Sequence, residues 1–597
     1  CEMASMNPKI EALAKEWIEI DYHKPTKEAI QKLLNEGNEA ELDKLLSKRL
    51  AFGTAGLRGP MGAGYNRMNH VTVFQCTQGI VAYLEKTFEP AKLKEMGVVI
   101  GYDHRQNSTG VDSEMMARVA AAVCVSKGIK VYLFGKMVAT PMVPFGVKFK
   151  GCAAGMMVTA SHNPKDDNGY KMYGSNGAQL CEPHDQAIAD LILTNLKPWA
   201  DYGTLANTVR DSALCVEDLD GISAAYYKEM GETLCYHKAD NAAAKLKIVY
   251  TAMHGVGAPF CERSFATFGH NAFFPVEEQN KPDPAFPTVA YPNPEEGKGA
   301  LQLSFETAAR VGSPLVLAND PDADRLAVAE QKADGTWRMF SGNEIGMLLA
   351  HWLFTKASLP PAKLAVVAST VSSKMTRALA QKEGMRFEET LTGFKWICNK
   401  KFDLQQEGYQ VVVAFEESIG FCCGDLVNDK DGVCAAAVFA EMANQLYAKN
   451  MTVAQHMTTL YDTYGHFISR QGYVVVPDPS LTVAIFDRLR NGEYPKTCGK
   501  FAIKEVRDLT VGYDTSTPDH KTTLPASQSS QHLTFTFENG CVANLRGSGT
   551  EPKLKYYVEL NGPDPAQVTA TLLEMVTTIV ERFLEPERNG LTWAGVE

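Results

Sequence analysis

The sequence predicts an α/β protein in which three α/β units are followed by a smaller C-terminal α+β unit. Its 597 residues correspond to about four domains at roughly 150 residues per domain. Short apolar, β-branched runs alternate with longer segments of helical period, which is typical of β-α repeats with parallel strands. From Tyr473 onward the pattern changes to strand-like pieces and one final helical segment.

The predicted strands of the first three units each lead into polar residues. They lie at 98–100, 156–158, 248–250, 315–317 and 411–413. The residues that follow them include Asp103, Ser161, His254, Asp320 and Glu416. In open α/β sheets ligands bind outside the carboxyl ends of the strands, so we expect these polar groups to line one cleft.

Turn-rich stretches near 196–207, 335–343 and 464–472 indicate boundaries between the units. We therefore predict four domains, with the bounds 1–207, 208–340, 341–468 and 469–597. In the last domain, strands are predicted at 474–476, 533–537 and 556–559, before a helix at 566–583.

The composition is that of a globular protein and excludes several classes. Hydrophobic residues make up 45% and charged residues 22% of the chain, which argues against wholesale disorder and coiled coil. The formal net charge of −11 disfavours general binding to nucleic acid or to an anionic membrane surface. Any anionic ligand must therefore be small and bound by a local group of cations.

Cysteine usage and the N-terminal segment favour a cytoplasmic protein. The 14 cysteines are too dilute for a disulfide scaffold, and no C-x-x-C pair occurs. Charged residues such as Glu11 and Lys15 interrupt the apolar core that a signal peptide needs, and no uncharged apolar run of about 18 residues occurs. We expect reduced thiols and no membrane partner.

The sharpest motif is the run NDPDADR at 319–325. Asp320, Asp322 and Asp324 can converge on one hard cation, and oxygen ligands suit Mg²⁺. An EF-hand would need Gly and Glu where this chain has Arg325 and Gln331, so a calcium loop is excluded. The alternative is a solvated acidic turn, but the apolar strand just before the run favours a metal.

The second motif is TASHNP at 159–164, which continues to NGYK at 168–171. Ser161, with His162 beside it and Lys171 ten residues on, is placed to carry a covalent group. The G-x-S-x-G elbow of α/β-hydrolases is absent. The alternative is an Asx or Ser turn that Asn-Pro terminates.

Two glycine-rich runs can bind anions. RGSGT at 546–550 offers a backbone nest and the guanidinium of Arg546, and GTAGLRG at 53–59 offers Arg58. Neither has the spacing of a P-loop, and each could be an ordinary tight turn.

The run EES at 416–418 could bind sugar hydroxyls, with TGFK at 392–395 as a companion loop. The alternative is that the acidic pair lies on a solvated face. A serine, a metal, two anion sites and a polyol loop together indicate phosphoryl transfer on a phosphosugar.

These motifs, in this order, resemble those of the α-D-phosphohexomutase superfamily, the phosphoglucomutase and phosphomannomutase enzymes. The resemblance spans nearly the whole chain, from the loop at 53–59 to the loop at 546–550. More finely, GTAGLR at 53–58, TGFKW at 392–396 and DKDG at 429–432 resemble the phosphoglucomutase-2-like branch, which includes a phosphopentomutase and a glucose 1,6-bisphosphate synthase.

The resemblance implies three similar α/β domains with mixed sheets and a C-terminal α+β domain around a central active-site cleft. In chain order, the four domains would carry the phosphoserine, metal-binding, sugar-binding and phosphate-binding loops. Ser161 would be the phosphoserine, and Asp320, Asp322 and Asp324 would hold Mg²⁺ together with a phosphoserine oxygen.

The same resemblance implies roles for the other motif residues. Arg58, Lys171 and Arg325 would stabilise the transferring phosphoryl group. The remaining substrate-binding residues would be Glu416, Ser418, Thr392, Gly393 and Lys395 around the sugar, and Arg546, Ser548, Gly549 and Thr550 around its far phosphate.

The general acid and base stay open. Bacterial members carry a histidine four residues after the first sugar-loop glutamate, where this chain has Gly420. The residues that could take over are His162, Lys171 and Lys430.

The implied activity is an isomerase of carbohydrate metabolism, a phosphoglucomutase that interconverts glucose 1-phosphate and glucose 6-phosphate through bound glucose 1,6-bisphosphate. A phosphopentomutase acting on ribose or deoxyribose 1-phosphate is the close alternative, and a glucose 1,6-bisphosphate synthase is another. Two alternatives belong to other classes: a sugar-phosphate-binding scaffold without turnover, and a phosphohydrolase. The expected partners are small sugar phosphates, with the protein a monomer or weak homo-oligomer.

Overall fold

The computed structural model describes residues 6–53, 56–296, 299–528, 530–548, 552–593 and 595. Its elements fall into two units. Unit 1 contains 1–367 and 393–453, and unit 2 contains 368–392 and 454–597.

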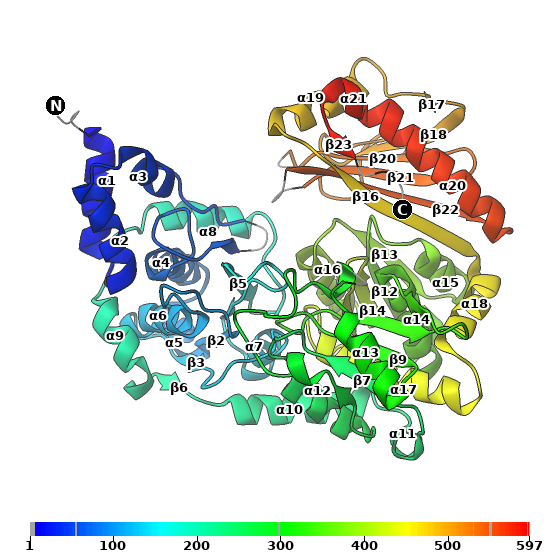
Figure 1. Ribbon diagram of the computed structural model, residues 1–597, viewed down its shortest axis with the longest axis horizontal. Coiled ribbons are helices and arrows are strands. Elements are labelled where there is room, and N and C mark those ends of the chain that lie inside the picture. Colours follow the sequence, from blue (N-terminus) through cyan, green and yellow to red (C-terminus); the bar gives the residue numbers. More distant parts are fainter. Residues whose placement is uncertain are drawn as a thin grey trace. The chain divides into compact units, whose positions relative to one another are not determined.

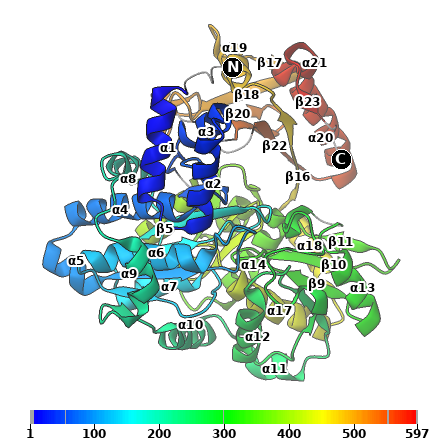
Figure 2. The same ribbon diagram turned by 60° about the vertical axis from the view of Figure 1, so that its left-hand side comes forward.

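Three helices precede the first sheet of unit 1 and pack on one another (Figures 1 and 2). They are α1 (Pro8–Ile20), α2 (Lys24–Asn35) and α3 (Glu39–Leu46). Asn7 caps α1 by accepting a hydrogen bond from the Lys9 amide at 3.0 Å. The buried Trp17 of α1 meets the ring of Tyr65 edge-on, with 5.0 Å between the ring centroids, so these helices share the core of the first sheet.

The first sheet has six strands in the order β1-β5-β4-β2-β3-β6. Their bounds are β1 (Leu57–Pro60), β2 (Val98–Tyr102), β3 (Val131–Leu133), β4 (Ala154–Val158), β5 (Asp167–Gly174) and β6 (Cys215–Val216). Strand β2 is parallel to β3 and β4, whereas β5 is antiparallel to β4 and β1, so the sheet is mixed. Its helices are α4 (His70–Thr87), α5 (Pro90–Met96), α6 (Ser113–Ser126), α7 (Met142–Lys150), α8 (His184–Leu193) and α9 (Tyr202–Thr208).

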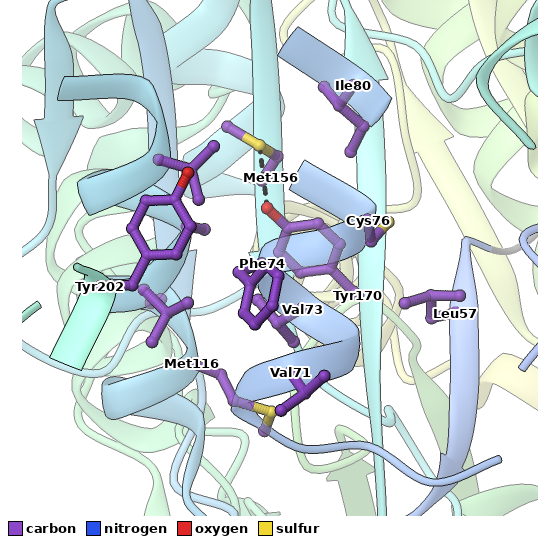
Figure 3. Packing of buried hydrophobic residues seen from close by; sticks show 14 of the residues in the cluster. Leu57, Val71, Val73, Phe74, Cys76, Ile80, Met116, Met156, Tyr170 and Tyr202 are labelled. Atoms are coloured by element: carbon purple, nitrogen blue, oxygen red, sulfur yellow. Dashed lines mark hydrogen bonds between the residues drawn. The ribbon is translucent and has the colours of Figure 1, made fainter. Parts of the chain in front are cut away.

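Strand β5 separates the core of this sheet from the polar groups on its other face. Figure 3 shows Tyr170 of β5 among buried residues such as Phe74 of α4, with its hydroxyl donating to the Met156 sulfur at 3.0 Å. Successive side chains of a strand point to opposite faces, so the next residue, Lys171, points away from this core.

The second sheet, with the order β11-β10-β9-β7-β8, is also mixed. Strand β7 (Ile248–Thr251) is parallel to β8 (Phe274–Pro275) and β9 (Leu315–Ala318), and the hairpin of β9, β10 (Ala327–Gln331) and β11 (Trp337–Met339) is antiparallel. Its helices are α10 (Leu219–Thr233), α11 (Lys238–Ala243), α12 (Gly257–Phe268) and α13 (Gln302–Val311).

A third α/β group completes unit 1. It comprises α14 (Gly342–Lys356), β12 (Leu364–Ser369), α16 (Phe394–Gln406), β14 (Gln410–Glu416), β15 (Gly420–Cys423) and α17 (Gly432–Ala448). A capping box of Ser341 and Glu344 begins α14. Strands β14 and β15 are antiparallel and place Glu416 opposite Gly420.

Unit 2 is built on an antiparallel sheet with the order β17-β18-β20-β21-β22-β16-β23, and β19 pairs with β18. The strands are β16 (His466–Val475), β17 (Thr497–Cys498), β18 (Phe501–Asp508), β19 (Tyr513–Asp514), β20 (His532–Phe537), β21 (Val542–Gly547), β22 (Lys553–Gly562) and β23 (Thr592–Trp593). Helix α20 (Pro565–Ile579) packs on β16 and β22. The unit also contains α15 (Met375–Glu383), β13 (Arg386–Thr390), α18 (Val453–Tyr464), α19 (Pro479–Arg490) and α21 (Pro586–Asn589).

The strands predicted in the α/β units are confirmed as β2, β4, β7, β9 and β14. The stretch 464–472, from whose turn-forming residues a domain boundary was predicted, is mostly strand. Gly465 has φ +106°, and residues from His466 onward form β16. The backbone there is satisfied by a ladder with β22, which the local composition does not reveal.

Candidate active site

Ser161 lies in the loop after β4 and is 3% exposed. Its φ is +52°, in the left-handed region, where a non-glycine residue costs about 1–3 kcal/mol unless its surroundings hold it. Its Oγ donates to Asp320 Oδ2 at 2.8 Å and lies 3.2 Å from His162 Nδ1. The hydroxyl therefore faces the acidic motif that the sequence singled out.

Asp320, Asp322 and Asp324 follow β9 and are fully buried. One carboxylate oxygen of each lies within 4.8 Å of the others. The Oδ1 atoms of Asp322 and Asp324 are buried and have no hydrogen-bond partner among the described residues. Such oxygens fit a hard divalent cation, so the residues present suit the Mg²⁺ that the motif predicted.

The pKa values of Asp320 and Asp322 are shifted in opposite directions. Burial, and then Asp322 and Asp324, raise the pKa of Asp320 well above its ordinary value. Burial would also raise the pKa of Asp322, but the Lys171 ammonium and hydrogen bonds lower it. A cation at the three carboxylates would offset the repulsion that Asp320 experiences.

Two lysines are paired with the same carboxylates. Lys171 Nζ lies 2.8 Å from Asp322 Oδ2 and 2.9 Å from Asp324 Oδ2, and Lys430 Nζ lies 3.4 Å from Asp324 Oδ2. Burial alone would lower the pKa of both lysines, but the carboxylates raise it above the ordinary value. Both side chains are therefore ammonium ions.

Arginines and a neutral histidine surround the serine. Arg58 Nη1 donates to Asn163 Oδ1 at 3.0 Å, and Arg325 Nη1 lies 3.8 Å from Glu295 Oε2. The Nε atoms of Arg58 and Arg325 are buried without a partner in the described part of the chain. Burial, and then the charges of Arg325 and Arg58, lower the pKa of His162 well below its ordinary value. These donors suit an anion beside Ser161.

The predicted sugar loop lies next to the acidic loop. The Leu326 amide donates to the Ile419 carbonyl at 3.1 Å, and Arg325 and Gly420 form an isolated antiparallel bridge. Ser418 is half-buried between Glu416, at the end of β14, and Ile419. Burial raises the pKa of Glu416 although Lys430 opposes the shift.

Gly420 leaves room for Lys430. A Cβ atom at position 420 would lie 2.4 Å from the Lys430 Cδ. The Lys430 side chain thus fills the space beside position 420, where bacterial members were expected to carry a histidine.

The predicted phosphate loop is part of unit 2. Arg546 of β21 donates from Nη1 to Thr392 Oγ1, and its Nε is buried without a partner among the described residues. The Ser548 amide donates to the Lys553 carbonyl at 2.9 Å. Gly549 and Thr550 lie outside the described residues.

Lys395, which was predicted to lie around the sugar, is paired with a carboxylate of α8. It follows Gly393, whose φ is +105°, in the first turn of α16. Its Nζ lies 3.3 Å from Asp185 Oδ2, and both side chains are buried. The ammonium therefore binds α8 in this structure.

The structure also brings in residues that sequence reasoning missed. Thr140 donates from Oγ1 to Asp322 Oδ2 at 2.6 Å, and the Tyr173 hydroxyl donates to Asp429 Oδ2 at 2.8 Å. Arg105 binds the loop of Ser161. The one sequence signal for Arg105 is its place just after β2, whereas nothing local marks Thr140.

None of the helices in the described residues has both the length and the apolarity that crossing a bilayer requires. The arrangement in unit 1 suits a phosphoryl group that leaves a serine, reaches a sugar and returns. That chemistry defines the class of intramolecular phosphotransferases.

Comparisons with known proteins give the family. Models of the phosphoglucomutase/phosphomannomutase α/β/α domains I, II and III match residues 49–198, 224–335 and 341–464. The human phosphopentomutase is 47% identical over 593 residues, which cover 96% of each chain. The human glucose 1,6-bisphosphate synthase is 45% identical over 605 residues, 99% of this chain and 97% of the relative.

Two further comparisons agree. The phosphoribomutase of Saccharomyces cerevisiae is 39% identical over 581 residues, 91% of each chain. The crystal structure of a phosphoglucomutase/phosphomannomutase family protein from Burkholderia thailandensis shares the fold, with a TM-score of 0.62 at 18% identity over 89% of this chain and 97% of that chain. The chain belongs to the phosphoglucomutase/phosphomannomutase family, and it is an isomerase that transfers a phosphoryl group within its substrate.

Proposed function

We propose that this protein is a phosphopentomutase that interconverts the 1-phosphate and the 5-phosphate of ribose or deoxyribose. The observation that carries the proposal is the near-full-length similarity to human phosphopentomutase, which the yeast phosphoribomutase extends. The glucose 1-phosphate reading came from the motifs of the superfamily alone, and these relatives support its pentose alternative better.

In the proposed cycle, phosphorylated Ser161 transfers its phosphoryl group to the 5-hydroxyl of ribose 1-phosphate. The sugar hydroxyl gives its proton to a base and its oxygen forms the new P–O bond, while the bond to Ser161 Oγ breaks and Oγ takes a proton from an acid. The resulting 1,5-bisphosphate reorients and returns its 1-phosphoryl group to Ser161, which releases ribose 5-phosphate. Glucose 1,6-bisphosphate would serve as the primer that first phosphorylates Ser161.

The cations beside Ser161 would stabilise the charge that spreads over the equatorial phosphoryl oxygens. Arg58 and Arg325 offer unpartnered Nε donors, and Lys171 is held as an ammonium ion. Asp320, Asp322 and Asp324 would hold Mg²⁺, whose charge would further stabilise these oxygens.

His162 and Lys430 are the candidates for the base and the acid by their positions. His162 is neutral and lies 3.2 Å from Ser161 Oγ, and Lys430 lies 3.4 Å from Asp324 Oδ2 beside Gly420. The pKa of His162 is lowered and that of Lys430 is raised, so geometry and not the pKa supports these roles. Glu416, Ser418 and Thr392 would bind sugar hydroxyls, and Arg546, Ser548, Gly549 and Thr550 the far phosphate.

The test is a ³¹P NMR time course on purified protein with Mg²⁺ and catalytic glucose 1,6-bisphosphate. Ribose 1-phosphate and glucose 1-phosphate compete in one tube, so that their relative rates give the ratio of kcat/KM. We expect ribose 1-phosphate to convert at least about tenfold faster, a preference of about 1.4 kcal/mol.

Other outcomes identify the alternatives. Faster conversion of glucose 1-phosphate would make the protein a phosphoglucomutase, and inorganic phosphate without isomer formation would make it a phosphohydrolase. Net formation of glucose 1,6-bisphosphate from glucose 1-phosphate, in a second tube that contains an added phosphoryl donor, would favour the synthase, to which the chain is almost as similar. If folded protein that carries phosphate on Ser161 converts neither sugar, the protein is a sugar-phosphate-binding scaffold without turnover.

A further inference from the structure

Arg105 is 1% exposed, and no predicted catalytic or binding role includes it. Its Nη1 donates to the carbonyl oxygens of Pro164 at 2.7 Å and Asp167 at 3.0 Å. Its Nη2 donates to the carbonyl oxygens of Ser161 at 2.6 Å and Asn163 at 2.7 Å. One guanidinium thus connects both ends of the loop 161–167, and we call these four hydrogen bonds the clamp.

Asp103 fixes the direction of this guanidinium. Its Oδ2 lies 3.5 Å from Arg105 Nε, and both side chains are fully buried. Its Oδ1 accepts hydrogen bonds from the Arg105 amide at 3.0 Å and from Ser113 Oγ at 2.6 Å. Ser113 belongs to α6 and accepts in turn from Asn168 Nδ2 at 2.9 Å, so the clamp is anchored in two further elements.

The clamp acts on the strained residue itself. The carbonyl of Ser161 is one of the four acceptors, and its direction depends on the backbone torsions of Ser161, of which φ is +52°. Relaxing Ser161 to an ordinary backbone conformation would turn that carbonyl away from Arg105. Leaving the buried carbonyl unpaired would cost about 1–3 kcal/mol, similar to the strain that relaxation would relieve.

The four bonds also use every hydrogen on the two terminal nitrogens of Arg105. It therefore has no terminal donor left for a substrate phosphate. Its Nε, like those of Arg58 and Arg325, is buried without a hydrogen-bond partner in the described part of the chain, but it lies 3.5 Å from Asp103 Oδ2.

We propose that Arg105 is a positioning residue for phosphoryl transfer, which holds Ser161 in its left-handed conformation so that Oγ faces Asp320. The role rests on the proposed function, since it takes Ser161 as the phosphoryl carrier. Losing the clamp should misplace the reacting oxygen without removing any group that contacts the sugar. Misplacement by about 1 Å can lower a rate about 100-fold.

The test compares Arg105→Lys with Arg118→Lys. Lysine keeps the charge but has no planar fork and cannot reach four carbonyls. Arg118 of α6 is the matched control, because it also donates to carbonyls, those of Ala206 at 2.9 Å and Asn207 at 2.7 Å, away from Ser161. Mass spectrometry first establishes that the wild-type protein carries phosphate on Ser161, and its absence would refute the proposed function itself.

For phosphorylated Arg105→Lys we expect kcat to fall about 30-fold or more while KM stays within about threefold. The ³¹P resonance of its phosphoserine should shift, and hydrolysis of that phosphate should rise at least about fivefold relative to transfer to sugar. Arg118→Lys should match the wild type within about twofold in each measurement. Asp103→Asn, which removes the orienting charge but keeps the shape, should show a smaller change in the same direction.

Four results would overturn the proposal. They are an unchanged kcat in Arg105→Lys, an equal loss in Arg118→Lys, a raised KM at constant kcat, and unfolding of both Arg105→Lys and Asp103→Asn while Arg118→Lys stays folded. The third would make Arg105 a binding residue, and the last would make it a stability residue.

Discussion

At the scale of single residues, backbone strain coincides with the three loops of the candidate site in unit 1. Ser161, Ala323 and Ile419 have φ values of +52°, +56° and +51°, and each lies on a different loop. Such conformations persist only where neighbouring contacts hold them, as the carbonyl bonds of Arg105 do for Ser161. Residue types in the sequence do not reveal these conformations, because none of the three is glycine.

Gly420→Ala tests whether the position of Lys430 matters. The added Cβ would lie 2.4 Å from Lys430 Cδ and should push the ammonium away from Asp324. We expect kcat to fall about tenfold, with the free energy of unfolding lowered by about 1–3 kcal/mol from the added volume. Steady-state kinetics and urea unfolding measure the two effects.

Gly299→Ala is the matched control for Gly420→Ala, since a Cβ there meets nothing within 4 Å. A wild-type kcat in Gly420→Ala would remove Lys430 from the catalytic candidates. A loss of kcat in both variants would show that the effect is not specific to Lys430.

At the scale of elements, the sequence predicted those site residues that directly follow an apolar strand. The strands before Ser161, Asp320 and Glu416 are apolar and local, so their ends could be located from composition. Contacts between distant elements could not be predicted this way. Thr140 reaches Asp322 from 182 positions away, and Lys395, which was predicted to lie around the sugar, pairs with Asp185 of α8.

The segment 368–392 is tied within unit 2 by one carboxylate, that of Glu389, whose side chain is 10% exposed. Glu389 lies 3.0 Å from Lys374 Nζ, 2.6 Å from Arg377 Nη2 and 2.7 Å from Arg507 Nη1 of β18. Burial alone would raise the pKa of Glu389, but these three cations lower it below its ordinary value of 4.5. A carboxyl with a lowered pKa stabilises the fold above its unfolded pKa, and the stabilisation is lost as the pH falls towards the folded value.

Glu389→Gln should therefore lower the free energy of unfolding by about 2 kcal/mol at pH 7, because it leaves three partly buried cations without their shared carboxylate. The difference from the wild type should shrink as the pH falls below 4.5. Urea unfolding of the full chain at several pH values measures this difference in the free energy of unfolding. Glu388→Gln, which breaks a more exposed pair with Arg386, should cost less than about 1 kcal/mol, and an equal cost in both variants would contradict the account.

At the scale of the whole molecule, the sequence predicted the α/β class and the C-terminal change of pattern correctly. The change was visible because an antiparallel sheet with a covering helix has another periodicity than β-α repeats. The four domain bounds stay a prediction. That 368–392 belongs to unit 2 could not be predicted, since it depends on contacts such as those of Glu389 with β18.

The central claim is that Ser161 exchanges its phosphoryl group with a pentose phosphate. The most direct measurement mixes protein that carries ¹⁸O-labelled phosphate on Ser161 with one equivalent of unlabelled ribose 1-phosphate and quenches within milliseconds to seconds. Mass spectrometry follows the label on the Ser161 peptide, and ³¹P NMR follows the sugar. The account predicts that the labelled phosphoryl group leaves Ser161 and appears on the 5-oxygen of ribose 1,5-bisphosphate or ribose 5-phosphate, at a rate at least as fast as turnover. Label that stays on Ser161 while unlabelled ribose 5-phosphate forms, or that leaves only for water, would contradict it.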